Sequence, residues 1–348
     1  MKTMFKVLVK FIMISSTYIL HAQDSHFSQF DKSPLMINPA LAGALYKTQV
    51  NLNYRSQWSS VNSPFKTFGF SADQRFGGGR KQNGFFGVGL YALSDNASSK
   101  TITTMDLKLS VSGHIRINKQ SSIGLGIQAG MLQRSLTTSN FQWGSQYNGN
   151  AYDPTISNAE GTSASYNSIS VFDVSSGIVY SYNSNEYQKV TGNNDKFLNF
   201  GVSFYHLNKP SYSFQGGNEK LPIKITAFAN SLFNIQNTNV AVGPSFLYQR
   251  QSNASELLIG SRVRYMIGNA SKVTNFKSAS AVSMGCYLRY KDAIVTLFQY
   301  EIKNYLVGFS YDINVSKLRS YSNLRGGFEL SLRFVAPTPY GGNSRSRI

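Results

Sequence analysis

The residues that could hold a metal ion or act as a nucleophile are few and widely separated in this chain. There is one cysteine, Cys286, and there are four histidines, at positions 21, 26, 114 and 206. A zinc site needs several such ligands at short, characteristic spacings, and no histidine here has a second histidine or cysteine at such a spacing. Cys286 alternates with Met284 and Leu288, without the nearby base and orienting acid that an activated nucleophile requires. We therefore expect no metal site, and we expect Cys286 to be a small apolar residue that faces lipid.

Acidic residues and glycine-rich segments also lack the patterns that catalysis or cofactor binding requires. The 16 Asp and Glu residues are scattered, without a paired cluster for general acid–base chemistry. The segment Gly77-Gly-Gly-Arg-Lys81 resembles a phosphate-binding loop, but it lacks the Gly-Lys-Ser/Thr ending and the following helix, so we expect a turn. The sequence thus predicts a protein that is not an enzyme and that binds no cofactor.

Composition places the chain among folded, β-rich, basic proteins. Of its 348 residues, 41% are hydrophobic, 14% are aromatic and only 14% are charged, which excludes intrinsic disorder. A single cysteine excludes a disulfide scaffold. The formal net charge is +18, but no basic helix or nucleic-acid-binding motif accompanies it. We expect no nucleic acid partner; a basic exported protein would instead attract anionic lipopolysaccharide and acidic surface proteins.

The N-terminus has the residue order of a secretory signal peptide. Three lysines within the first ten residues precede the apolar run Phe11–Leu20, and the small residue Ala22 follows. This apolar run is about half as long as a membrane-spanning helix requires. We expect residues 1–22 to be removed and the mature protein to reach the outer membrane.

Most of the remaining chain alternates polar and apolar residues with a period of two, as β-strands do. The clearest segment is Thr103–Ile117. Its odd-numbered positions from 105 to 117 are apolar or Gly, and its even-numbered positions carry Thr, Asp, Lys, Ser, Ser, His and Arg. This run is longer than the about five or six residues of an ordinary strand, and it reaches the about nine to eleven that cross a bilayer when tilted. The length favours a membrane barrel over a soluble two-sheet sandwich, whose polar faces would also carry more charge.

Fourteen such segments lie between residues 48 and 335, and they predict an all-β fold, a transmembrane antiparallel β-barrel of about 14 strands. The segments are 49–55, 66–74, 85–93, 103–117, 121–133, 168–182, 196–207, 221–233, 239–250, 256–267, 279–290, 293–300, 305–314 and 326–335. An even number of strands returns both termini to the periplasm and puts the longest connection, 134–167, outside, as bacterial barrels prefer. The candidates for aromatic girdles at the membrane interfaces are Tyr54, Tyr91, Tyr180, Tyr182, Tyr205, Tyr290, Tyr300 and Phe334.

Residues 23–47, which precede the first strand, follow neither a strand nor a helix pattern. Two prolines break ladders and helices alike, whereas the two phenylalanines and several aliphatic residues are too apolar for a free tail. Three placements remain open: a plug inside the lumen, a docking segment at the periplasmic mouth, and a lead-in that only covers the barrel floor. The candidate partner-contact residues in this segment are Phe27, Phe30, Pro34, Asn38 and Pro39.

Charged residues in one loop and on the polar strand faces are further candidates for contacts. Residues Ile313–Arg325 end a strand and begin a loop in which Lys317 and Arg319 could contact an acidic adhesin domain or lipid phosphate, or simply be solvated. Other charged side chains on the inward faces could tune a pore or hold an inserted peptide, or pair with acids such as Asp173. The candidate lumen-facing residues are Asp106, Lys108, Arg116, Arg262 and Arg264.

Several segments, taken together, resemble one protein family. They are Gln23–Gly43, Asn53-Tyr-Arg-Ser-Gln-Trp58, Leu207-Asn-Lys-Pro-Ser-Tyr-Ser-Phe214, Gly308-Phe-Ser-Tyr-Asp-Ile-Asn-Val-Ser-Lys-Leu-Arg319 and Gly326-Gly-Phe-Glu-Leu-Ser-Leu332. In this order the chain resembles the PorP/SprF family of outer-membrane proteins, from the type IX secretion and gliding motility system of Bacteroidetes. The resemblance covers almost the whole chain after the signal peptide. Asp31 and Lys32 depart from the family pattern, as does the Ser/Arg-rich end of the C-terminal tail 336–348.

The resemblance implies a barrel without catalytic activity that is needed for secretion or surface attachment of large adhesins and other cargo with C-terminal sorting domains. Its implied partners are the translocon and the periplasmic ring of the same system, the cargo, and outer-membrane lipid. An outer-membrane porin or passive solute channel is the alternative, because periodicity alone says nothing about secretion. A porin predicts an open lumen with a charged constriction, whereas a secretion partner predicts a lumen filled by side chains or by the N-terminal segment.

Overall fold

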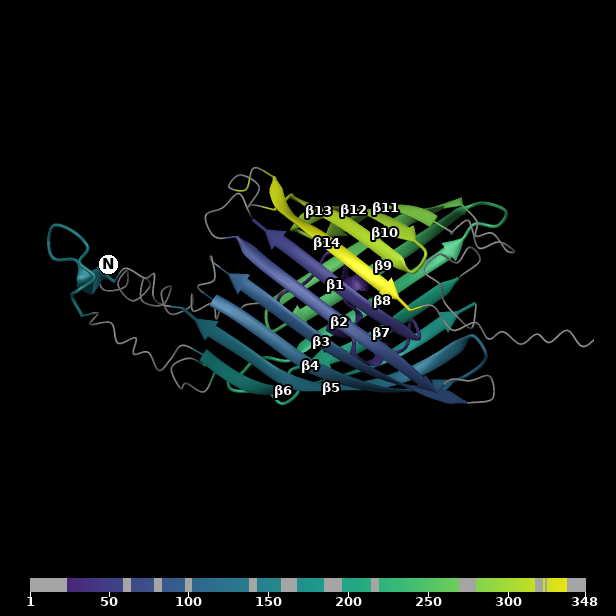
Figure 1. The fold of residues 1–348 in the computed structure, drawn as a ribbon, viewed down its shortest axis with the longest axis horizontal. Helices are drawn as coiled ribbons and strands as arrows, with labels where there is room; N and C mark the ends of the chain where they lie inside the picture. Colours follow the sequence, from purple (N-terminus) through teal and green to yellow (C-terminus); the bar gives the residue numbers. More distant parts are fainter. Residues whose placement is uncertain are drawn as a thin grey trace, which may run out of the picture.

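Fourteen antiparallel strands close into one barrel in the computed structural model (Figure 1). The structure describes residues 24–58, 64–77, 83–97, 102–137, 143–157, 168–184, 196–213, 219–268, 280–316, 322 and 324–336. Each strand pairs with its neighbours in sequence, and β14 (Arg325–Val335) closes the barrel against β1 (Thr48–Gln57). The prediction of an all-β barrel of about 14 strands is confirmed. The predicted signal peptide and most of the C-terminal tail lie outside the described residues.

The predicted segments each overlap one strand. The other strands are β2 (Phe65–Gly77), β3 (Gly84–Ala97), β4 (Ile102–Arg116), β5 (Ser121–Leu136), β6 (Ser168–Asn183), β7 (Phe197–Tyr205), β8 (Lys224–Asn234), β9 (Val240–Gln251), β10 (Ala254–Gly268), β11 (Ser280–Arg289), β12 (Ala293–Ile302) and β13 (Tyr305–Asn314). Short helical turns are η1 (Phe30–Lys32), α2 (Pro34–Ile37), η2 (Pro39–Leu41) and η3 (Gly144–Gln146). Strand β7 ends before its predicted limit because His206 has a φ of +59°, which turns the chain out of the sheet.

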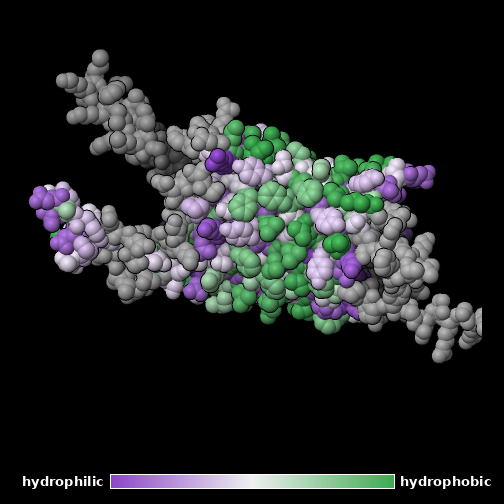
Figure 2. Space-filling model, turned by 45° about the horizontal axis from the view of Figure 1, so that its top comes forward, coloured by the Kyte–Doolittle hydropathy of each residue, from purple (hydrophilic) through white to green (hydrophobic). Residues whose placement is uncertain are grey.

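The alternation of residues separates an apolar outer face from a polar inner face. In β4, Leu107 and Leu109 are 55% and 60% exposed, whereas Lys108 and Ser110 are 2% and 0% exposed. Figure 2 shows the result on one face of the barrel, where hydrophobic residues gather along the middle and more hydrophilic residues lie towards the two ends. An outward apolar band of this kind matches the hydrocarbon core of a bilayer. Among the described residues, no helix is both long and apolar enough to cross a membrane.

Aromatic residues on the outer face only partly follow the predicted girdles. Pairs of rings lie across neighbouring strands, with centroids 5.0–5.8 Å apart: Tyr54–Phe328, Tyr180–Phe200 and Tyr305–Phe334. Cys286 is exposed on this face, as expected. The placement of Tyr91 and Tyr205 in a girdle is wrong, because both are buried inside the barrel, at 4% and 3% exposure. Their positions fall on the inward side of the alternation in β3 and β7, so their rings pack in the lumen.

The two ends of the barrel carry connections of different length. We call the end where β1 begins and β14 finishes the terminal end, and the opposite end the loop end. The loop end carries the long connections 137–167 and 206–223. The terminal end carries shorter turns such as 117–120 and 303–304, although two of its connections, 184–196 and 269–279, are also long.

Candidate functional site

Residues 24–46, which we call the plug, run through the lumen from the loop end to the terminal end (Figure 1). At the loop end, the Asp24 amide donates to Gln251 Oε1 at 3.0 Å. At the terminal end, the Gly43 amide donates to Asp73 Oδ2 at 2.8 Å, and Arg75 Nε donates to the Gly43 carbonyl at 2.6 Å. The chain therefore crosses the whole barrel before its first strand begins.

The apolar core of the protein lies inside the barrel, between the plug and the wall. One cluster consists of Phe30, Ile37, Ala40, Leu41, Ala44, Val179, Phe228, Leu247, Leu258, Tyr287, Val295 and Leu297. A second cluster consists of Phe27, Leu35, Met36, Ala42, Tyr91 and Leu93. Burying one large apolar side chain is worth about 1.5–3 kcal/mol, so the plug is an integral part of the folded barrel.

Two prolines and one asparagine shape the middle of the plug. Pro34 and Pro39 stand at the starts of α2 and η2, where the missing N–H costs no helical hydrogen bond. Between these turns, Asn38 Oδ1 accepts from the Ala40 amide at 2.8 Å. Asn38 Nδ2 donates to one carbonyl on β6 and one on β7, at 3.0 and 3.1 Å. Asn38 is fully buried, so it is a polar anchor between plug and wall.

Glycines on the inward face of the wall make room for the plug backbone. A Cβ at Gly87 would overlap the Ala42 carbonyl, and one at Gly126 would overlap the backbone of Ala40. Any larger residue at these positions would push the plug away from the wall. The wall is therefore shaped to fit this segment closely.

A buried network of charges at the loop end ties the plug to β1, β11, β13 and β14. Arg55 and Arg289 lie 2.8 and 2.9 Å from Asp312 Oδ2. The Ser28 hydroxyl of the plug accepts from both arginines, at 3.0 and 2.6 Å, and lies 2.8 Å from Asp312 Oδ1. Glu329 accepts from two adjacent plug amides at 2.7 and 3.0 Å. Buried charges are tolerated only when they are paired and hydrogen-bonded in this way, and the plug supplies part of that hydrogen bonding through Ser28 and Gln29.

A second network of charges at the loop end holds Asp24 of the plug. Asp24 Oδ2 lies 2.9 Å from both Lys224 Nζ and His206 Nε2. His206 Nδ1 lies 3.0 Å from Asp173, which also pairs with Lys108 at 2.7 Å. Burial opposes the charge of His206, but its hydrogen bonds to the two carboxylates raise its pKa above the ordinary value.

Asp31 and Lys32 of the plug pair with each other inside the lumen. Their charged atoms lie 2.8 Å apart, and Arg262 lies 3.3 Å from Asp31. Arg333 donates to the Asp31 carbonyl. These contacts give the plug charged partners on β10 and β14.

The five candidate lumen-facing residues all lie on the inner side of the barrel. Lys108, Arg262 and Arg264 are buried, whereas Asp106 and Arg116 are partly exposed. Lys108 pairs with Asp106 at 2.7 Å, and Arg264 pairs with a glutamate on β12 at 2.8 Å. Arg116 lies apart from these networks, at the terminal end.

The candidate partner-contact residues fall into two groups. Phe27, Phe30, Pro34, Asn38 and Pro39 are buried in the lumen, where a partner could reach them only after the plug had moved. Lys317 and Arg319 lie outside the described residues.

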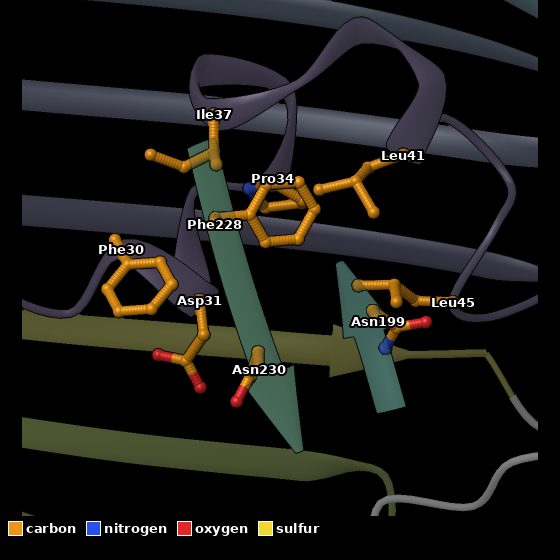
Figure 3. Close-up of a pocket in the computed structure, with 9 residues that line it drawn as sticks. All are labelled: Phe30, Asp31, Pro34, Ile37, Leu41, Leu45, Asn199, Phe228 and Asn230. Atoms are coloured by element: carbon orange, nitrogen blue, oxygen red, sulfur yellow. The ribbon is translucent and has the colours of Figure 1, made fainter. Parts of the chain in front are cut away.

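An apolar cavity lies between the plug and strands β7 and β8 (Figure 3). Its empty space is about 280 Å³, and its lining residues are Phe30, Asp31, Pro34, Ile37, Leu41, Leu45, Asn199, Phe228 and Asn230. Figure 3 shows Phe228 of β8 beside Pro34 of the plug. This mostly apolar space is unsuited to a charged solute.

The inward arginines and acids of β1, β11, β13 and β14 were missed as site residues by the sequence reasoning. Arg55, Arg289 and Asp312 all occupy positions that the strand alternation assigns to the polar face. A search for opposite charges on the inward faces of different strands, at the same distance from the end of the barrel, would have found them. Among the described residues, no group of three or more His, Cys, Asp or Glu could hold a metal ion.

The fold and the filled lumen define a plugged β-barrel of the outer-membrane type. The chain belongs to the PorP/SprF family, because the family model described as "Type IX secretion system membrane protein PorP/SprF" matches residues 19–334. The family resemblance found in the sequence is confirmed, and the protein is a membrane component of type IX secretion.

Solved structures with similar folds are outer-membrane barrels of several kinds. BamA from Haemophilus ducreyi lacking POTRA domains 1–3 is 9% identical, with a TM-score of 0.42 over 83% of this chain and 70% of that chain. The CymD monoaromatic hydrocarbon channel is 11% identical, with a TM-score of 0.43 over 88% and 93%. The TodX deltaS2S3 mutant channel is 10% identical, with a TM-score of 0.46 over 86% and 93%. No curated protein matches the chain.

Proposed function

We propose that this protein supports the export or surface attachment of large adhesins and other cargo with C-terminal sorting domains, as a closed and non-catalytic barrel. The observation that carries the proposal is the plug, whose apolar and charged residues fill the lumen along its length. A lumen filled in this way leaves the mouths and the outer face, rather than a pore, as the surfaces that can work with partners. Those partners are the type IX translocon, the periplasmic ring and the cargo itself.

The proposed location is the outer membrane, reached after removal of residues 1–22, with the apolar band in contact with lipid. The terminal end would face the periplasm, because barrels of this type place their longer loops outside the cell. In this orientation the plug begins at the outer mouth, at Asp24, and ends at the periplasmic mouth, where β1 starts.

A comparison of surface and culture-fluid proteins, with and without this gene, tests the secretion role. Loss of one or a few large cargo proteins from the surface supports a dedicated partner, and broad loss of proteins with the same sorting domain supports a part of the core machinery. Complementation with the native gene must restore the missing proteins. An unchanged surface proteome would overturn the proposal and favour a porin.

Conductance of the purified full chain in a planar lipid bilayer tests the closed lumen separately. We expect no steady open conductance, because plug side chains are packed against the wall from end to end. A stable ohmic current with discrete open steps would contradict a closed barrel, and it would support the alternative of a passive solute channel.

A further inference from the structure

A pocket opens at the terminal end, where the plug leaves the lumen. It has about 430 Å³ of empty space and lies between the plug exit and the wall strands from β2 to β6. Its lining residues are Ala44, Arg75, Phe85, Arg116, Asn118, Lys119, Gln120, Ser121, Ser122, Ser181 and Asn183. Three of these side chains are cationic and none is a carboxylate.

Arg75 is held rigidly at one side of the pocket. Its Nε and one terminal nitrogen donate to the carbonyls of Gly43 and Ala44, at 2.6 and 2.7 Å. Its guanidinium lies 4.3 Å from the centre of the Phe85 ring, which in turn stacks on His114 at 4.3 Å. A guanidinium fixed by the plug on one side and an aromatic ring on the other is an oriented positive charge that loses little entropy on binding an anion.

The tight turn between β4 and β5 supplies the other two cations. Asn118 Oδ1 accepts from the amides of Gln120 and Ser121, at 2.8 and 2.6 Å, which shapes the turn that carries Lys119. Arg116 precedes this turn on the inward face of β4. Together with Arg75, these residues place three positive charges around one concave site.

A buried hydroxyl supports the assignment of the pocket as a binding site. Ser181 is only 8% exposed and lines the pocket, yet its Oγ has no hydrogen-bond partner among the described residues. A buried polar atom without a partner is costly, and an oxygen ligand in the pocket would satisfy it. Lys196, which precedes β7, is a further exposed cation at this end of the barrel.

We propose that this pocket binds carboxylate groups of an acidic polypeptide segment that approaches the barrel from the terminal end. Arginines bind carboxylates through charge-assisted hydrogen bonds, and the lysine adds a third cation at the rim. The lining residues face the lumen, whereas lipid contacts the opposite face of the strands, so the geometry favours a polypeptide over a lipid headgroup. Because Ala44 forms part of the pocket, the bound segment would also touch the end of the plug.

Binding of fluorescein-labelled hexaglutamate to the purified full chain in detergent micelles tests this proposal. The double variant Arg116→Gln/Lys119→Gln should bind about tenfold more weakly, since it removes two of three cations. The matched control Lys209→Gln/Lys220→Gln makes the same change of charge at exposed positions of the loop end, and it should leave binding almost unchanged. Binding to the native chain should also weaken as ionic strength rises, because partly exposed charges are screened.

Three outcomes would overturn the proposal: no saturable binding, equal weakening in both double variants, or equal binding of uncharged hexaglutamine. Displacement of the peptide by glycerol phosphate at far lower concentrations than by glutamate would instead assign the pocket to a phosphate headgroup. Gel electrophoresis of unheated and heated samples confirms that each variant is folded, because a folded barrel migrates differently before it is heated. The assay uses purified protein, so its failure is distinguishable from failure of the secretion role.

Discussion

Asn38 provides the sharpest test of how firmly the plug is held. Replacement of Asn38 by Ala removes the acceptor of the Ala40 amide and the donors to the Ile178 and Val202 carbonyls. Each lost hydrogen bond is worth about 1 kcal/mol, and the buried amide left without an acceptor costs about 1–3 kcal/mol. The variant should therefore hold its plug about 3 kcal/mol less tightly, which increases the population of the plug-released form about 100-fold.

Thiol labelling measures this population directly. Ser33 lies in the plug and is 4% exposed, so Ser33→Cys in a Cys286→Ser background places a single buried thiol there. When opening and closing are fast relative to labelling, the rate of reaction with a soluble maleimide follows the population of the open form. We expect Asn38→Ala to speed labelling by about two orders of magnitude.

Two further variants decide what the result means. Asn148→Ala removes similar side-chain caps, at 3.0 and 2.9 Å, in the exposed connection between β5 and β6, and it should leave the labelling rate almost unchanged. Asn38→Asp keeps the acceptor but sets a second oxygen against the two wall carbonyls, so its plug should be released at least as readily as that of Asn38→Ala. If Asn38→Ala labels less than about threefold faster than the parent, Asn38 is not an anchor and the reasoning fails.

Three further expectations concern the charge networks and the direction of the plug. Arg55→Met leaves Asp312 short of one buried partner and should lower the free energy of unfolding in urea by about 3–5 kcal/mol, and a loss below about 1 kcal/mol would contradict that role. Because its two carboxylate partners raise the pKa of His206, the protonated ring stabilises the fold fully below the unfolded pKa of about 6.5, and this stability is lost as pH rises through the folded pKa. Urea unfolding at increasing pH should show this loss in the native chain, and the same slope in His206→Gln would refute it. An epitope tag between Gln23 and Asp24 should bind antibody on intact cells, whereas a C-terminal tag should need permeabilised cells; the reverse pattern would invert the proposed orientation.

The strand pattern of this barrel was predictable because it is local. Alternation in segments such as 103–117 assigned each side chain to one face, and closure into a barrel turned those faces into lipid and lumen. The limits of β7 were less predictable, because a single residue, His206, leaves the strand through a left-handed conformation. The girdle prediction was wrong for Tyr91 and Tyr205. Their residue type suggested the membrane interface, but their positions in the alternation of β3 and β7 place both side chains inside the barrel.

The candidate site was only partly visible in the sequence. Lys108, Arg262 and Arg264 were assigned to the lumen from alternation, and each has an acidic partner there. The network around Arg55 and Asp312 was not found, because those residues are 257 positions apart and become neighbours only across the closed barrel.

The sequence by itself determined the class of fold and the family, because strand periodicity and short motifs are properties of consecutive residues. It also determined that the N-terminal segment was too apolar and too rich in proline to be a strand or a free tail. Only the tertiary structure decided where that segment lies, since its contacts reach from Asp24 to Lys224 at one end and from Gly43 to Asp73 at the other. Such pairings depend on strand register and depth within a closed wall, which no local pattern specifies.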